Sequence, residues 1–144
     1  MSNKQVVVFG VHDSLSGQIC QMIREFTDYE IKFFISTHNN KINIGKKHKD
    51  PNKKFTSVKN ARFLEKKVYF SKAYINLIKK HNIDKCFILE DDQEVREGIY
   101  NKLKKNKINV LSFIHPSTFL GGKNTIEDGV IIFPKCYIAY KTDI

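Results

Sequence analysis

The last thirty-two residues, "FIHPSTFLGGKNTIEDGVIIFPKCYIAYKTDI" (residues 113–144), place an aliphatic side chain at every sixth position. These aliphatic residues are Ile114, Leu120, Ile126, Ile132, Ile138 and Ile144. A helix repeats every 3.6 residues and a strand alternates every two, so neither explains a step of six. Hexapeptide repeats are typical of a parallel β-helix, in which three short strands make one triangular coil around stacked aliphatic side chains. An antiparallel appendage that steps by six by chance is the alternative.

We expect residues 114–144 to form the first one to two coils of such a β-helix. A single repeat cannot bury its apolar face alone, and about three are needed for a stable stack. We therefore expect either that the natural chain continues past Ile144 or that this short stack pairs with another chain.

The preceding residues have the pattern of an α/β domain. The apolar run VVVF at 6–9 ends at Gly10, and apolar residues then recur at helical spacing over residues 15–26. A second apolar run follows at residues 31–35. A strand, a helix and a strand within about thirty residues predict a βαβ unit with strands buried on both faces.

The same alternation continues further along the chain. We expect a helix capped by Ser71, a strand at 86–89, and a helix whose capping box pairs Asp91 with Glu94. Another strand is expected at 110–114.

Residues 1–113 therefore predict a small Rossmann-like domain with a parallel sheet, and residues 114–144 a second unit. The polar and basic residues 37–65 suggest a loop, with a short strand near 41–44 as an alternative.

The net charge of +10 is concentrated in one segment. Residues 41–80 hold twelve lysines and one arginine against two acidic residues. A basic patch can bind nucleic acid, an anionic membrane face or a phosphorylated ligand. No aromatic residue interleaves "KKHKDPNKK", as single-strand stacking requires, so a solvated lysine-rich loop is favoured over nucleic-acid binding for the basic segment 41–67.

The chain has no apolar run long enough to span a bilayer and no recognisable signal peptide, so a cytoplasmic protein without membrane insertion is expected. Its three cysteines, Cys20, Cys86 and Cys136, lie in apolar surroundings. We expect buried, reduced thiols rather than a disulfide or a metal site.

Ligands of open parallel sheets bind beyond the carboxyl ends of the strands. In this sequence those ends are Gly10–Gly17, Ser36–Thr37 and Glu90–Asp92. The first turn leads into a helix N-terminus, which suits a phosphate group. The turn does not match G-x-G-x-x-G, and no acidic residue ends the second strand, which argues against NAD(P).

The order of segments resembles a known family. A small α/β domain, "IHPST" and hexapeptide coils together resemble the sugar O- and N-acetyltransferases of bacterial surface-glycan pathways, of the sialic acid O-acetyltransferase and bacillosamine N-acetyltransferase type. The similar stretches are "VVVFG", "SGQICQMI", "CFILEDDQEVREGIYNKL" and "FIHPSTFLGGKNTIEDGVIIFPKCYIA". They cover nearly the whole chain except residues 37–70.

The resemblance implies an N-terminal domain that binds a nucleotide-linked sugar, with a UDP-linked amino sugar expected. It also implies a left-handed β-helix that forms a homotrimer and uses acetyl-CoA as co-substrate. The general-base histidine of the family lies on a later coil, so no catalytic residue is assigned in this chain and one is expected beyond Ile144. His115 belongs to the entry motif, where ordering the first corner is favoured over catalysis.

The candidate nucleotide-sugar-binding residues are Gly10, His12, Ser14, Ser16, Gly17, Thr37, Asp92, Gln93 and Arg96. Simple loop and capping roles are the alternative for all of them. The family turn has more glycines, and Asp91 stands where a glycine is usual, so the ligand preference stays open.

Three functions follow as hypotheses. The first is the N-terminal portion of an acyl-CoA-dependent acetyltransferase acting on a nucleotide-linked amino sugar or a surface-glycan sugar. The second is a non-catalytic module for nucleotide-sugar binding or assembly. The third is a basic nucleic-acid-binding domain.

Overall fold

A computed structural model describes residues 4–11, 15–36 and 62–144. Its main sheet has six strands in the order β3-β4-β2-β1-β5-β6. The strands are β1 (Gln5–Phe9), β2 (Glu30–Ser36), β3 (Arg62–Phe63), β4 (Lys66–Phe70), β5 (Lys85–Ile88) and β6 (Asn109–Val110). The helices are α1 (Leu15–Phe26), α2 (Tyr74–Lys80) and α3 (Gln93–Lys105).

The sheet is parallel except at one edge. β1, β2, β4, β5 and β6 pair in parallel, whereas β3 pairs antiparallel with β4. From the central β1 the chain first builds outward through β2 and β4, and then returns to add β5 and β6 on the other side. The expected α/β fold with a predominantly parallel sheet is confirmed.

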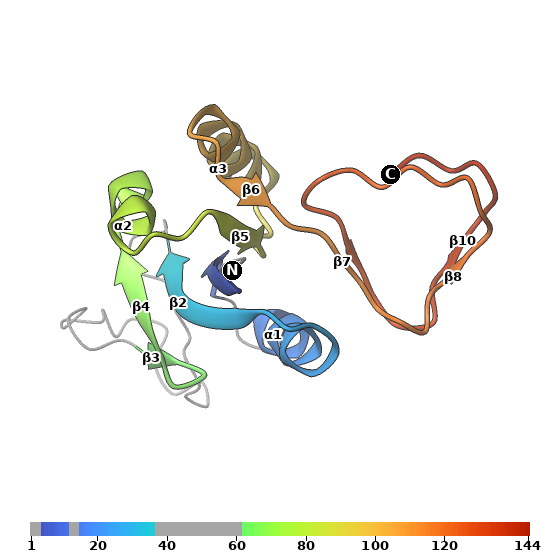
Figure 1. Ribbon diagram of the computed structural model, residues 1–144, viewed down its shortest axis with the longest axis horizontal. Helices are drawn as coiled ribbons and strands as arrows, with labels where there is room; N and C mark the ends of the chain where they lie inside the picture. The colour runs from blue at the N-terminus through green and yellow to red at the C-terminus, as the bar shows by residue number, and fades with distance from the viewer. Residues whose placement is uncertain (1–3, 12–14, 37–61) are drawn as a thin grey trace.

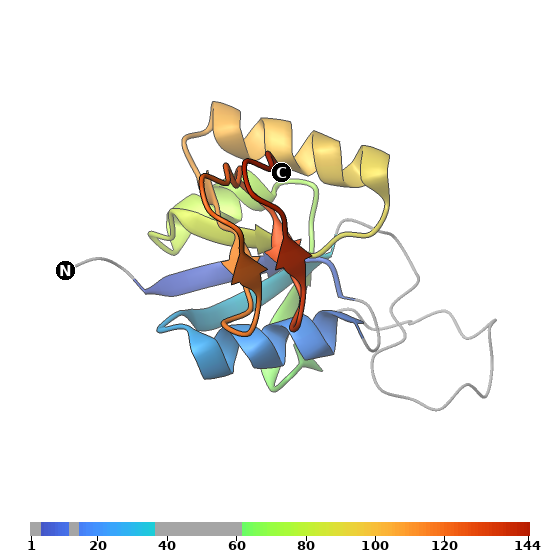
Figure 2. The same ribbon diagram turned by 90° about the vertical axis from the view of Figure 1, so that its right-hand side faces the viewer.

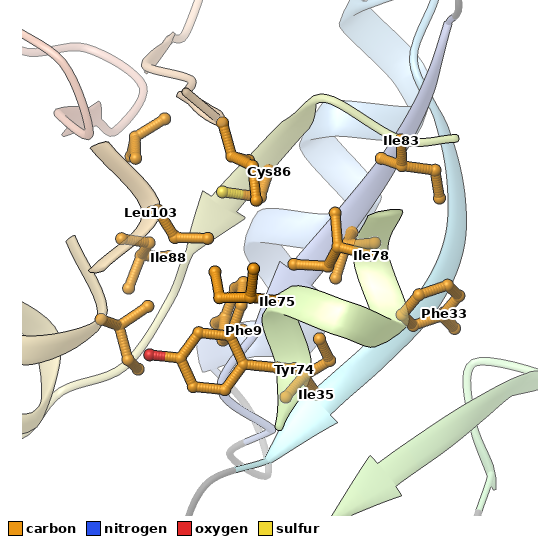
Figure 3. Close-up of a cluster of buried hydrophobic side chains, with 14 residues drawn as sticks. Phe9, Phe33, Ile35, Tyr74, Ile75, Ile78, Ile83, Cys86, Ile88 and Leu103 are labelled. Carbon is orange, nitrogen blue, oxygen red and sulfur yellow. The ribbon is translucent and has the colours of Figure 1, made fainter. Parts of the chain in front are cut away.

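The helices form two layers that enclose the sheet (Figures 1 and 2). Along β1 the side chains alternate: Val6 and Val8 belong to the apolar cluster of α1, and Val7 and Phe9 to that of α2 and α3. Figure 3 shows the second cluster, with Phe9 beside the ring of Tyr74. Burial on both faces explains why β1 is a continuous apolar run.

Both predicted helix caps differ from the structure by one or two residues. The N-cap of α2 is Ala73, without a side-chain cap, and Ser71 Oγ accepts a hydrogen bond from the Ala73 N–H (3.0 Å). The N-cap of α3 is Asp92 rather than Asp91, and its carboxylate accepts from the Val95 N–H (3.0 Å). Cap position depends on where the backbone leaves the strand, which the local pattern does not determine.

Two strands fall where no strand was predicted. β3 and β4 form a hairpin within and just after the expected loop, and Phe63 and Val68 bury their side chains. The alternative strand at 41–44 lies outside the described residues. Within the described part of the chain, no helix is both long and apolar enough to cross a membrane.

The tail winds upon itself with a period of eighteen residues. Its strands are β7 (Phe113–Ile114), β8 (Phe119–Leu120), β9 (Ile131–Ile132) and β10 (Tyr137–Ile138). β7 pairs in parallel with β9, and β8 with β10, each residue with the one eighteen positions later. Thr125 and Asp143 form a parallel bridge at the same separation. In Figure 1 the tail traces a three-cornered outline with its successive turns superimposed.

The parallel pairing excludes the antiparallel appendage. The single strand predicted at 110–114 is wrong, because β6 ends at Val110 in the main sheet and β7 begins at Phe113 in the tail. Leu111 and Ser112 carry the chain between the two units. Phe113 is 3% exposed and joins the apolar cluster of α1, so the tail packs on the α/β domain.

The six aliphatic side chains differ in exposure along the tail. Ile132 is 6% exposed, whereas Leu120 and Ile144 are 41% and 38% exposed. Phe119 and Tyr137 are more exposed still, and their rings stack with centroids 5.4 Å apart. Of the six, only Ile132 is buried, whereas Leu120 and Ile144 are open to solvent.

Candidate functional site

The candidate site lies at the carboxyl edge of the sheet, where β1, β2 and β5 end side by side. The Gly10 N–H donates to the Ile35 carbonyl (3.0 Å), and the Leu89 N–H donates to the Phe9 carbonyl (2.7 Å). These bonds join three strand ends. The edge between β1 and β5 is also where the winding direction of the sheet reverses, which is the usual ligand position in open α/β sheets.

Gly10 is required at this point by both its conformation and its surroundings. Its φ of 89° lies in the left-handed region, and a Cβ atom would lie 2.8 Å from the Glu90 nitrogen and from the Leu89 carbonyl carbon. The close approach brings the β1 turn against the residue that follows β5. Of the predicted site residues, Gly10 has the clearest structural reason for its identity.

Glu90 lies at the same edge, although it is not among the candidate residues predicted from the sequence. Its side chain is buried, with 2% exposed, and its carboxylate accepts from the N–H groups of Asp91 (3.1 Å) and Asp92 (3.4 Å). A buried carboxylate beside Gly10 can accept hydrogen bonds from a ligand's hydroxyl or ring N–H groups. The position of Glu90 directly after the buried run Cys86–Leu89 marks it as a strand-end residue, but does not show that its side chain is buried.

The N-terminus of α1 contributes a second group to this edge. Ser16 is buried in the first turn, with 1% of its surface exposed, and Gly17 follows it. The first turn contains no acidic residue, so its positive dipole end is not neutralised within the helix. The predicted residues His12, Ser14 and Thr37 lie outside the described residues.

Two of the three predicted residues at α3, Asp92 and Arg96, have structural partners. Asp92 caps the helix and Gln93 is exposed at its first position. The Arg96 guanidinium donates to the Gly129 carbonyl of the tail (2.5 Å). Within the described chain Arg96 and Asp92 form no ion pair, so the structure brings Gly10, Ser16 and Asp92 to one edge and ties Arg96 to the coil.

Arg96 makes one of several contacts to a single corner of the coil. Ser112 Oγ donates to the Glu127 carbonyl (2.7 Å) and accepts from the Val130 N–H (2.9 Å). Lys104 pairs with Asp128 (2.6 Å), and this hydrogen bond raises the pKa of Lys104. The contacts hold residues 127–130 against α3 and the end of β6.

The described nucleophiles and histidines lie away from this edge or have structural partners. Burial raises the pKa of the Cys20 and Cys86 thiols to about 12, so both stay protonated at neutral pH. Cys136 is only half-buried, contrary to the expectation of burial, and all three thiols are free. His115 Nδ1 accepts from the Ser117 N–H (3.1 Å), which supports its corner-ordering role. No cluster of metal-ligating side chains occurs among the described residues.

Comparison with known proteins finds similarity in structure alone. No protein-family model matches the sequence, and no curated protein matches it. Solved structures of perosamine N-acetyltransferase (PerB) from Caulobacter crescentus, in complex with CoA and GDP-perosamine, have the same fold. The TM-score is 0.73 at 13% sequence identity, over 97% of this chain and 56% of that chain. The chain thus spans little more than half the length of these proteins.

Proposed function

We propose that this chain supplies the nucleotide-sugar-binding domain and the first coils of a left-handed β-helix in an acyl-CoA-dependent sugar acetyltransferase. The observation that carries the proposal is the parallel pairing at eighteen residues directly after a parallel α/β domain. Eighteen residues are three hexads, or one triangular coil. The fold shared with an enzyme crystallised with CoA and GDP-perosamine supports the same class of reaction.

The carboxyl edge of the sheet is the proposed nucleotide-sugar site. The first turn of α1, with Ser16 and Gly17, suits the diphosphate because the N-terminus of a helix carries the positive end of its dipole. Glu90 and Asp92, at the adjoining strand end, suit hydroxyl or ring N–H donors of the sugar or base. A nucleotide-linked amino sugar is the proposed ligand, with the UDP form expected and the GDP form suggested by the structural relative.

Acetyl transfer to an amine or hydroxyl needs a general base near the acceptor. The two described histidines are His115, at the first corner of the coil, and His81, whose ring hydrogen-bonds to the Leu77 carbonyl (2.9 Å). We propose that this chain binds the sugar nucleotide and that neither described histidine serves as the base. Acetyl-CoA is the proposed co-substrate.

Calorimetry with UDP, GDP and their N-acetylamino sugar conjugates tests the binding step. We expect measurable affinity for one nucleotide series, and weaker binding by about tenfold after Glu90→Gln, which removes the charge but retains the shape. The matched control is Glu94→Gln, on the exposed first turn of α3. Absence of heat at millimolar ligand with intact circular dichroism would contradict the proposal.

Assembly is a separate part of the proposal. We propose a homotrimer through the coil, supported by the exposed Phe119 and Tyr137 rings on its outer surface. Sedimentation equilibrium measures it directly. A monomer at all concentrations would contradict trimerisation of this chain without affecting the nucleotide-sugar proposal.

A further inference from the structure

A small pocket lies away from the candidate site, on the α1 face of the sheet. It has a volume of about 220 Å³ and is lined by Arg24, Tyr29, Glu30, Ile31, Phe34, Leu64 and Lys66. Glu30 and Lys66 begin β2 and β4, which places the pocket toward the amino-terminal edge of the parallel strands. Gly10 and Glu90 mark the opposite, carboxyl edge. The two sites are therefore separate.

The pocket combines apolar walls with a charged rim. Ile31 and Phe34 are buried, and Leu64 is a large apolar side chain left 37% exposed. Arg24, Lys66 and Glu30 give the rim one net positive charge. Within the described part of the chain none of these three charged groups forms an ion pair. Such a surface favours a molecule with an apolar body and one negative charge.

The hairpin that carries Leu64 is held in an unfavourable turn. Leu64 and Glu65, between β3 and β4, have φ angles of 46° and 66°. Two successive left-handed residues define the turn type that strongly prefers Asn-Gly, because bulky side chains are strained there. The hydrogen bond from Arg62 to the Glu65 carbonyl (3.0 Å) helps to hold this turn. The strained turn therefore holds the exposed Leu64 at the pocket.

We propose that this pocket binds a small monocarboxylate with a single apolar ring. The volume is below the roughly 300–1,000 Å³ of clefts for drug-sized ligands, which limits the body to about one ring. The Arg24 guanidinium forms paired hydrogen bonds with a carboxylate, and Lys66 adds a second positive charge. Tyr29 and Leu64, the partly exposed ring and apolar side chain of the lining, pack against the ligand ring.

Titration of the full chain with benzoate, followed by amide chemical shifts, tests the proposal. We expect shifts at Leu64 and Lys66 with a dissociation constant of about 1 mM or below. Benzamide has the same shape without the charge, and acetate has the charge without the ring, so both should bind at least fivefold more weakly. The proposal would be overturned if the shifts were confined to Gly10 and Glu90. It would also be overturned if benzoate at 20-fold excess over a dissociation constant of about 1 mM caused no shifts.

Charge variants separate a site from general attraction to a basic protein. Arg24→Gln and Lys66→Gln should each weaken benzoate binding about fivefold, and Glu30→Gln should strengthen it. Lys67→Gln is the matched control, because Lys67 lies over the Tyr69 ring (4.4 Å) and does not line the pocket. Equal effects of Lys66→Gln and Lys67→Gln would overturn the proposal.

The strained turn provides an independent readout. Leu64→Asn should raise the melting temperature by about 2–4 °C while it weakens benzoate binding several-fold, since it relieves strain and removes a wall. Glu65→Gly relieves strain next to the pocket and should raise stability with binding unchanged. If Leu64→Asn left binding unchanged, or if both variants lowered it equally, Leu64 would have no role in a pocket.

Discussion

The single residue that most constrains the candidate site is Gly10. Its backbone bonds to β2, and its Cα faces the peptide between Leu89 and Glu90 at a distance that leaves no room for a methyl group. Moving a side chain relieves neither the strain in φ nor a clash with backbone atoms. A substitution here should therefore separate β1 from β5 at the site.

We predict that Gly10→Ala lowers the free energy of unfolding by about 3 kcal/mol, as measured by urea denaturation. Gly98→Ala is the control and should change stability in the opposite direction, because Gly98 lies in α3 with open space around it. There alanine should raise stability by about 0.5–1 kcal/mol. Equal effects at the two glycines would contradict the close approach described at Gly10.

The cysteines differ in burial, which gives a prediction on reactivity. Because burial raises the pKa of Cys20 and Cys86 from 9.0 to about 12, the folded chain keeps their protons at pH 8.5. The thiolate is the reactive form, so iodoacetamide should modify Cys136 first, as peptide mass mapping would show. Faster modification of Cys20 than of Cys136 would contradict the described burial.

The same pKa shifts set the direction of the alkaline response. Above pH 9.0 the unfolded chain loses thiol protons that the folded chain retains. The contribution of these two thiols to the free energy of unfolding is complete below pH 9.0 and is lost as the pH rises toward 12.

At the scale of the element, α3 connects the candidate site to the coil. Its N-terminus is fixed by the Asp92 cap, and residues further along the helix contact the corner at 127–130. The acidic first turn and basic last turn also suit the helix dipole. Loss of the Asp92 cap should therefore disturb both the candidate site and the coil.

Asp92→Ala should cost about 1 kcal/mol in unfolding free energy, because the Val95 N–H loses its acceptor. Glu97→Ala removes the same charge from an exposed position in the same helix and should have little effect. Thermal denaturation followed by circular dichroism compares the two. Equal losses for the two variants would show that charge, not capping, is what Asp92 contributes.

The sequence predicted the elements whose patterns are local. The apolar run of β1 and the periodicity of α1 identified both, because burial on known faces leaves a regular pattern. The β3–β4 hairpin was missed since its turn, Leu64-Glu65, has neither of the residues that normally mark it. The apolar run at 110–114 was predicted to be one strand, because an apolar pattern does not mark the point where a chain leaves one sheet and enters another.

The candidate site was predicted in position and only partly in its residues. The edge formed by the ends of β1, β2 and β5 follows from parallel topology, and Gly10 was found there. Glu90 was passed over because burial of an acidic residue depends on the neighbouring strand and turn, which lie far away in the sequence. Arg96 was expected to bind the nucleotide-sugar, and its contact with Gly129 could not be predicted without the position of the coil.

At the scale of the whole molecule, the corner at 127–130 joins two units. The Arg96 guanidinium bonds to the carbonyl of Gly129, a buried residue. We predict that Arg96→Ala costs about 2 kcal/mol, because the carbonyl loses a charged donor. Lys104→Ala breaks an exposed ion pair and a distant contact with the Tyr100 ring (5.9 Å), and should change stability little. Urea denaturation should rank the two variants in that order, and the reverse order would contradict the buried contact.

The shared core should make the two units unfold together. Phe113 belongs to the coil through its pairing with Ile131 and to the α1 cluster through its ring. The chain has no tryptophan, so Tyr137→Trp adds a single fluorescent probe on the coil. We predict that its unfolding transition coincides with the circular dichroism of the α/β domain. Phe113→Ala should then shift both transitions by the same amount, at a cost of about 3–5 kcal/mol. A coil that melts first, with the domain unaffected, would show that Phe113 packs on the sheet without coupling the two.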